Sequence, residues 1–218
     1  MKFDLELDVQ DNTKAMALKE QLGLNEQPVF VAGSTHDQEE NICLDAFNEL
    51  RKIHRNALLI VVPRHPHRFE KVAQLCQATG YLVVKLSELN GKPLRTSPDI
   101  LVVDAMGMLK ACYQVASCAF VGGSFVHKGG HNALEPALYA VPTIMGPSIF
   151  NNPIICDVLE NAGGLKILSA PDQLADTALE WFNNADIAQR AGLANKQVIE
   201  KNRGAIEQTL EAIGEVFE

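Results

Sequence analysis

The sequence predicts an α/β domain built on a doubly wound parallel sheet, similar to a Rossmann fold. Apolar runs such as 57–62 are continuous rather than alternating, which is typical of strands covered by helices on both faces. Along the chain, these runs alternate with stretches of helical period, a rhythm that favours parallel strands joined by right-handed crossovers. The chain has 218 residues, 47% of them hydrophobic, which is enough to bury a core of this kind.

The first part of the chain is expected to lie outside the sheet. Residues 1–27 begin with polar and acidic residues and predict a linker followed by a short helix. This helix would end at Gly23, and the apolar stripe along it comprises Ala15, Met16, Leu18 and Leu22.

The second part, residues 28–218, predicts the Rossmann-like domain together with helices at its C-terminal end. Strands are expected at 28–32, 57–62, 81–86, 99–104, 118–121, 142–145 and 165–168. Helices are expected at 37–54, between 69 and 80, at 105–116, from 131, at 151–162 and from 171 onward, with a terminal amphipathic stripe at 205–216.

Four polar loops, rich in Gly or His, follow four of the predicted strands. They cover residues 33–36, 63–68, 104–108 and 122–132. Doubly wound sheets bind their ligands beyond the carboxyl ends of the strands. We therefore expect the four loops to gather around one ligand.

The loop after the strand at 118–121 carries the clearest pattern. It contains two glycine pairs, at 122–123 and 129–130, and runs into a predicted helix start at 131–132 with Glu135 in the first turn. Glycines let a backbone approach a ligand closely, and a helix N-terminus offers unpaired N–H groups that suit phosphate. Glu135 would lie within reach of sugar hydroxyls. Because no GxxxxGK[ST] pattern occurs, the loop is not a Walker loop, and a nucleotide-binding strand–loop–helix is the interpretation that it favours.

Simpler interpretations stay open for several of these residues. Arg64, at the exit of a strand, could pair with a phosphate or form a surface salt bridge. Ser34 or Thr35 could cap the following helix, and Glu135 could pair with a helix dipole. His36 and His131 could cap helices or contact a ligand. His65 and His67 lack a third metal ligand at a usual spacing, so no metal is expected.

The composition excludes some classes of protein. A net charge of −8 and a pI of about 5.3 argue against nucleic-acid binding. No apolar run approaches the roughly 18 residues needed to span a bilayer, so the chain is expected to be soluble and any membrane association to lie outside it. The cysteines are odd in number, lack CxxC spacing and have apolar neighbours, which predicts reduced core thiols in a cytosolic compartment. They are Cys43, Cys76, Cys112, Cys118 and Cys156.

At these loops the chain resembles the Kdo (3-deoxy-D-manno-octulosonic acid) transferases of lipopolysaccharide synthesis. The resemblance rests on GSTH at 33–36, PRHPHRF at 63–69, and GGS at 122–124 with GGHNALEPA at 129–137, in the order in which the family has them. The opening MKFD at 1–4 also resembles the segment that links the family's two domains.

The resemblance implies an inverting GT-B glycosyltransferase that transfers Kdo from CMP-Kdo to a lipid A precursor. The family's N-terminal domain carries the general-base glutamate, the acceptor site and the membrane anchor. This chain would then be the C-terminal half: it would bind CMP or CMP-Kdo as substrate, use no cofactor and transfer nothing alone. The parent protein would lie on the cytoplasmic face of the inner membrane of a Gram-negative bacterium.

The resemblance also implies which residues contact the nucleotide. Arg64 would bind the phosphate, the start of the helix at 132–135 would hold phosphate, and the Glu135 carboxylate would hold ribose. The implied nucleotide-binding residues are Pro63, Arg64, Met106, Gly107, Met108, Asn132, Ala133, Leu134 and Glu135. The secondary candidates are Ser34, Thr35, His65, Gly129, Gly130 and His131.

The sequence departs from the family at 104–109, where DAMGML replaces the usual D-T-x-G-E-L and Met108 stands in place of Glu. Backbone contacts are the ones expected there. A second hypothesis is a stand-alone nucleotide-sugar-using α/β enzyme of epimerase-like type that relies on His36, His65 or His131. It predicts turnover by the isolated chain, and it is disfavoured because no nucleophile–base pair occurs at a useful spacing.

Overall fold

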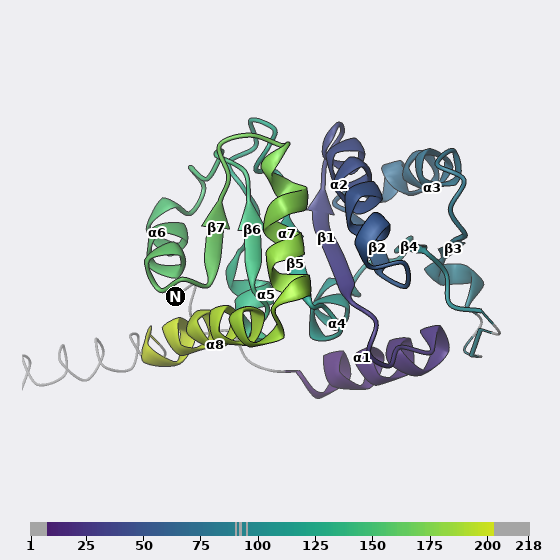
Figure 1. The fold of residues 1–218 in the computed structure, drawn as a ribbon, viewed down its shortest axis with the longest axis horizontal. Helices are drawn as coiled ribbons and strands as arrows, with labels where there is room; N and C mark the ends of the chain where they lie inside the picture. Colours follow the sequence, from purple (N-terminus) through teal and green to yellow (C-terminus); the bar gives the residue numbers. More distant parts are fainter. Residues whose placement is uncertain (1–7, 90, 92, 95, 203–218) are drawn as a thin grey trace, which may run out of the picture.

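The computed structural model describes residues 8–89, 91, 93–94 and 96–202, and a seven-stranded parallel sheet lies at its centre (Figure 1). The strand order is β3-β4-β2-β1-β5-β6-β7, so β1 to β4 lie on one side, with β4 between β2 and the edge strand β3, and β5 to β7 follow in order on the other side. This order confirms the predicted doubly wound sheet. The strands are β1 (Val29–Thr35), β2 (Leu58–Pro63), β3 (Val83–Lys85), β4 (Ile100–Val102), β5 (Cys118–Val121), β6 (Thr143–Met145) and β7 (Leu165–Ile167).

Helices cover both faces of the sheet because the strand side chains are apolar on both sides. In β1, Phe30 and Ala32 belong to the core cluster formed with α2, α3 and α7, whereas Val29 and Val31 belong to the cluster formed with α1 and α4. A third cluster joins β5, β6 and β7 to α5, α6 and α8. The described helices are α1 (Val9–Leu22), α2 (Glu39–Ile53), η1 (Pro66–Arg68), α3 (Phe69–Gln77), η2 (Leu86–Glu88), α4 (Leu109–Gln114), α5 (Leu134–Leu138), α6 (Pro153–Asn161), α7 (Gln173–Asn183) and α8 (Ala185–Asn202).

The predicted cysteine environment is confirmed, since all five thiols are buried and free. None of the described helices is both long enough and apolar enough to cross a membrane. The terminal stripe predicted at 205–216 lies outside the described residues, as does the start of the predicted linker.

Some local predictions were wrong. Met16 is 74% exposed and does not belong to the buried stripe of α1, because it lies on the opposite side of the helix from Leu18 and Leu22. The first strand does not end at residue 32 but continues to Thr35, because Gly33 pairs with both neighbouring strands and Thr35 pairs with β2. Ser34 and Thr35 therefore lie in a strand and do not cap α2.

Candidate functional site

Three loops meet at the carboxyl edge of the sheet, between β1 and β5, where the direction of building reverses. They follow β1, β2 and β5. The Arg64 N–H donates to the Thr35 carbonyl at 3.0 Å, and the Gly122 N–H donates to the Gly33 carbonyl at 2.8 Å. Ligands of doubly wound sheets bind at such a switch point. These contacts bring three of the four predicted loops into one candidate site.

The loop after β5, residues 122–131, is called the glycine loop below, and its two glycine pairs are hydrogen-bonded to each other. Gly130 donates to the Gly123 carbonyl at 2.8 Å, and His131 donates to the Gly122 carbonyl at 3.0 Å. A Cβ atom on Gly122 would lie 2.4 Å from the Ser34 carbonyl oxygen, which is closer than any side chain can approach. Only glycine at 122 therefore lets the glycine loop lie against β1.

Glu39 holds the glycine loop from the side of α2. Its side chain is fully buried, and its carboxylate accepts the backbone N–H groups of Gly123, Ser124 and Phe125 at 2.8 to 3.0 Å. The same carboxylate accepts the His36 N–H at 3.0 Å, so one side chain fixes two loops of the site. Burial raises the pKa of the Glu39 carboxyl, and the four N–H donors oppose that rise.

Arg68 anchors the loop after β2. Its guanidinium is nearly buried and donates to both carboxylate oxygens of Glu40, at 2.5 and 3.0 Å, and to Asp37 at 3.1 Å. Hydrogen bonds to Glu40 are the main reason that the pKa of Arg68 is raised. Arg68 is therefore a structural cation, and Arg64 is left as the arginine of this loop that is open to solvent.

Two histidines connect the loop after β1 to the glycine loop. The Nε2 atoms of His36 and His131 lie 2.7 Å apart, so one ring donates the hydrogen and the other accepts it. Burial, followed by nearby positive charge, lowers the pKa of His36 and lowers that of His131 to about 4. The pair is therefore neutral at pH 7. His65 packs edge-on against His36 with ring centroids 5.4 Å apart, and no group of three possible metal ligands occurs in the described part of the chain.

The segment from 131 to 135 leaves two backbone donors without a protein acceptor. The Leu134 N–H donates to the Asn132 side-chain oxygen at 3.2 Å, and the Glu135 N–H donates to the Asn132 carbonyl at 3.3 Å. Within the described residues, no acceptor is recorded for the N–H groups of Asn132 and Ala133. Helix α5 begins at Leu134, later than predicted, and it has five residues. Because α5 is so short, the feature that suits an anion here is the set of backbone N–H groups before the helix and not a long helix dipole.

Glu135 follows these donors in the chain, and the charges of two cations act on it. It is partly buried, and burial raises the pKa of its carboxyl, while the charges of Lys110 and Arg64 and a hydrogen bond with Asn132 lower it. Arg64 itself is exposed, and within the described residues it forms no ion pair at 4 Å or less. The surface salt bridge considered for Arg64 is therefore not seen, and its guanidinium can meet a ligand from solvent.

The fourth predicted loop, 104–108, lies at the same edge but is not in hydrogen-bond contact with the other three in the described structure. Its Asp104 carboxylate accepts the Ser87 N–H and hydroxyl at 2.9 and 2.6 Å. Met106 is 63% exposed, and Gly107 adopts a φ of +75°. Helix α4 follows at once and reaches the site, because Leu109 and Tyr113 pack where a Cβ on Gly33 would lie.

Glu39, Arg68 and Lys110 were not among the site residues predicted from the sequence. A signal for Glu39 was present, since it lies four residues before Cys43 on the buried face of α2, where a carboxylate is unexpected. A charged residue on an apolar helical stripe indicates a buried partner. Which partner it is depends on the glycine loop, 84 residues further along the chain.

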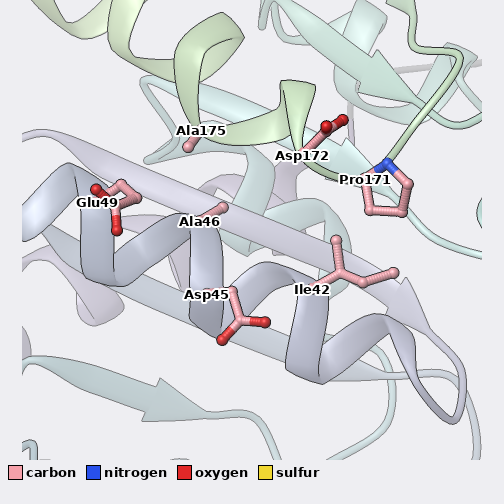
Figure 2. A pocket seen from close by; sticks show the side chains of 7 residues that line it. All are labelled: Ile42, Asp45, Ala46, Glu49, Pro171, Asp172 and Ala175. Atoms are coloured by element: carbon pink, nitrogen blue, oxygen red, sulfur yellow. The ribbon is translucent and has the colours of Figure 1, made fainter.

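A cavity of about 390 Å³ lies elsewhere, between α2 and α7 (Figure 2). The carboxylates of Asp45, Glu49 and Asp172 line it together with small apolar side chains, as Figure 2 shows. Three carboxylates would repel a phosphate. None of the four predicted loops contributes to its lining, which comes from α2, α7 and the loop between β7 and α7, so this cavity is not the predicted ligand site.

Comparison with known proteins points in one direction. No protein-family profile matches the chain. The 3-deoxy-D-manno-octulosonic acid transferase of Haemophilus influenzae is 35% identical over 98% of this chain and 49% of its own length, and that of Bordetella pertussis is 34% identical over 88% and 45%. The crystal structure of the C-terminal CMP-Kdo binding domain of WaaA from Acinetobacter baumannii superposes with a TM-score of 0.80, at 30% identity, covering 88% of this chain and 99% of that domain.

The doubly wound sheet, with its glycine-framed site at the switch point, is a Rossmann-like domain of the GT-B glycosyltransferase class. The chain spans about half the length of the curated relatives that it matches. It belongs to the family of 3-deoxy-D-manno-octulosonic acid (Kdo) transferases and corresponds to their C-terminal domain.

Proposed function

We propose that this domain binds CMP-Kdo, the sugar donor, for a glycosyltransferase. The observation that carries the proposal is an exposed Arg64 that forms no ion pair within the described residues and whose charge acts on the Glu135 carboxylate, next to the N–H groups of Asn132 and Ala133, which have no acceptor among those residues. A phosphodiester needs a cation and N–H donors, and a ribose needs an acceptor for its hydroxyls. CMP-Kdo offers both groups, and the domain of Acinetobacter baumannii WaaA is named for binding it.

The roles of the site residues follow from their positions. Arg64 and the N–H groups at 132 and 133 would hold the phosphate, with Pro63 placing Arg64 at the end of β2. Glu135 would accept hydroxyl hydrogens from the ribose. The backbone of residues 106–108 would line the nucleoside, because Met108 has no carboxylate to offer. Leu134 is fully buried, so it would support the site by packing and not by contact.

Glu39 and the His36–His131 pair would shape the site without binding the donor directly. Ser34, Thr35, Gly129 and Gly130 would act in the same way, since all four are buried in the framework of the loops. His65 is exposed and lies next to Arg64, so it would remain a secondary contact.

We further propose that the whole protein transfers Kdo to a lipid A precursor in lipopolysaccharide synthesis, at the cytoplasmic face of the inner membrane of a Gram-negative bacterium. The acceptor site, the general base and the membrane contact would belong to the half of the relatives that this chain does not match. Transfer by this domain alone is not expected. The epimerase-like alternative has less support, because the relatives compared above are named as transferases.

The test is a calorimetric titration of the domain with CMP, UMP and AMP. CMP should bind more tightly than UMP or AMP, and Arg64→Ala and Glu135→Gln should each weaken CMP binding about tenfold or more, as expected for a lost charge-assisted contact. Arg55→Ala and Glu20→Gln are matched controls at exposed positions and should bind CMP normally. Absence of CMP binding at millimolar concentration would overturn the proposal.

A further inference from the structure

Helix α1 contacts the candidate site at two points, although it lies outside the sheet (Figure 1). The first contact is made by Lys14, whose ammonium group donates to the Gly107 carbonyl at 3.1 Å. Gly107 is exposed and has a φ of +75°, and the hydrogen bonds of Asp104 to Ser87 hold only the start of its loop. Lys14 therefore supplies a side-chain restraint to the one predicted loop that makes no hydrogen bond to the other three in the described structure.

The second contact runs through α4. Asp11 is 7% exposed, and its carboxylate lies 3.7 Å from the ammonium group of Lys110 in the first turn of α4. The charge of Lys110 in turn acts on Glu135. Asp11 thus joins α1 to the first turn of α4 through Lys110, the residue whose charge acts on the proposed ribose contact.

These two contacts are not what holds α1 in place. The helix is packed by Leu18 and Leu22, which are 2% and 1% exposed and join the core cluster beneath β1 and β2. A single hydrogen bond from a half-buried lysine at the protein surface adds little to folding stability. The fold therefore does not need Lys14, which leaves the position of the 104–108 loop as the property that this side chain controls.

We propose that α1 is a positioning helix for the nucleotide site, with Lys14 fixing the 104–108 loop and Asp11 holding Lys110 beside Glu135. This inference rests on the proposed function, because it assigns residues that act on the donor through other residues. It predicts that changes on α1 alter nucleotide affinity without altering the fold.

The experiment compares CMP affinity by calorimetry for the domain and four variants. Lys14→Met should weaken CMP binding about three- to tenfold, the range expected when a binding loop must be ordered at the cost of binding. Lys14→Arg should restore affinity, because a guanidinium can reach the same carbonyl. Lys19→Met is the matched control on the last turn of α1 and should bind as the wild type does. Asp11→Asn should weaken binding about threefold by freeing Lys110.

Two further readouts separate positioning from a loss of structure. The melting temperature without ligand should be the same for Lys14→Met and Lys19→Met. The backbone amide resonance of Met108, which shares its peptide group with the Gly107 carbonyl, should shift in Lys14→Met and stay unchanged in Lys19→Met. If Asp11→Asn proves unstable, the Lys14 series alone decides.

The outcomes distinguish the two proposals. If the wild-type domain does not bind CMP, the proposed function fails. If the wild type binds CMP and Lys14→Met binds it equally well, the proposed function stands and the role of α1 is overturned. Weaker binding by Lys14→Met, with rescue by arginine and an unchanged melting temperature, supports the inference.

Discussion

Glu39→Gln is the substitution that most directly tests how the glycine loop is held. The carboxylate accepts four backbone N–H groups, two on each oxygen. The glutamine amide keeps one oxygen as an acceptor but presents its NH₂ group to the other two backbone N–H groups. Two charge-assisted hydrogen bonds are therefore lost, and two backbone donors face a side-chain donor.

The size of the effect follows from these bonds. Each hydrogen bond to a charged group contributes about 1.5–3 kcal/mol, so the loss of two costs about 3–6 kcal/mol. Removing a buried charge returns part of this cost, as the raised pKa of Glu39 indicates, which leaves a net loss of about 2–4 kcal/mol. For a chain of 218 residues, that loss lowers the melting temperature by about 4–9 °C.

The assays are urea unfolding and amide hydrogen exchange. Glu39→Gln should lower the free energy of unfolding by the amount above and speed exchange at 123–125. Glu49→Gln, an exposed position of the same helix, should change stability by less than about 0.5 kcal/mol. If Glu39→Gln matches Glu49→Gln in stability, and the amides at 123–125 exchange at the wild-type rate, the carboxylate does not hold the loop.

Three more predictions concern the same edge of the sheet. The pKa of His131 is about 4 in the folded protein and 6.5 in the unfolded chain, so between these pH values the unfolded state binds a proton that the folded state does not. The free energy of unfolding should therefore fall as the pH drops through this window. Because His131 is partly exposed, the loss should be about 1–2 kcal/mol by chemical unfolding, and His131→Asn should flatten it. Gly122→Ala should destabilise the domain by about 2–4 kcal/mol in the same assay, because its Cβ would lie 2.4 Å from the Ser34 carbonyl oxygen. In calorimetry, CMP affinity should fall as salt rises from 50 to 500 mM, and Arg64→Ala should show a weaker dependence.

Sequence reasoning located the sheet and the strand exits because burial and period are local properties. The continuous apolar run at 57–62 predicts a covered strand wherever it lies in the fold, and β2 occupies 58–63. The end of β1 was misplaced because Gly33 and Ser34 are typical of turns; Ser34 does adopt a φ of +55°, as a bulge, but Gly33 pairs with β2 and β5 and Thr35 pairs with β2, so the strand continues past it. Pairing with the neighbouring strands outweighed the local turn propensity of these residues.

The residues of the candidate site also fall into those that the local sequence predicts and those that depend on tertiary contacts. The first glycine pair and Arg64 were found because they follow strands directly, and the topology alone brings such positions together; the second glycine pair was found by its repeat of the first and its place before a helix start. Glu39 and Lys110 were missed because their partners are distant in sequence, and only the packed structure shows which backbone groups or charges they meet. The contacts of the residues implied by family resemblance remain predictions until a donor nucleotide is bound.

The charges at this edge explain how a protein of net charge −8 can hold a phosphate. The carboxylate of Glu39 is occupied by four N–H donors, and that of Glu40 is paired with Arg68. The histidine pair is neutral, so it neither repels nor attracts an anion. With these two carboxylates compensated, the exposed guanidinium of Arg64 and the N–H groups at 132 and 133 are expected to make the potential positive where the phosphate would lie.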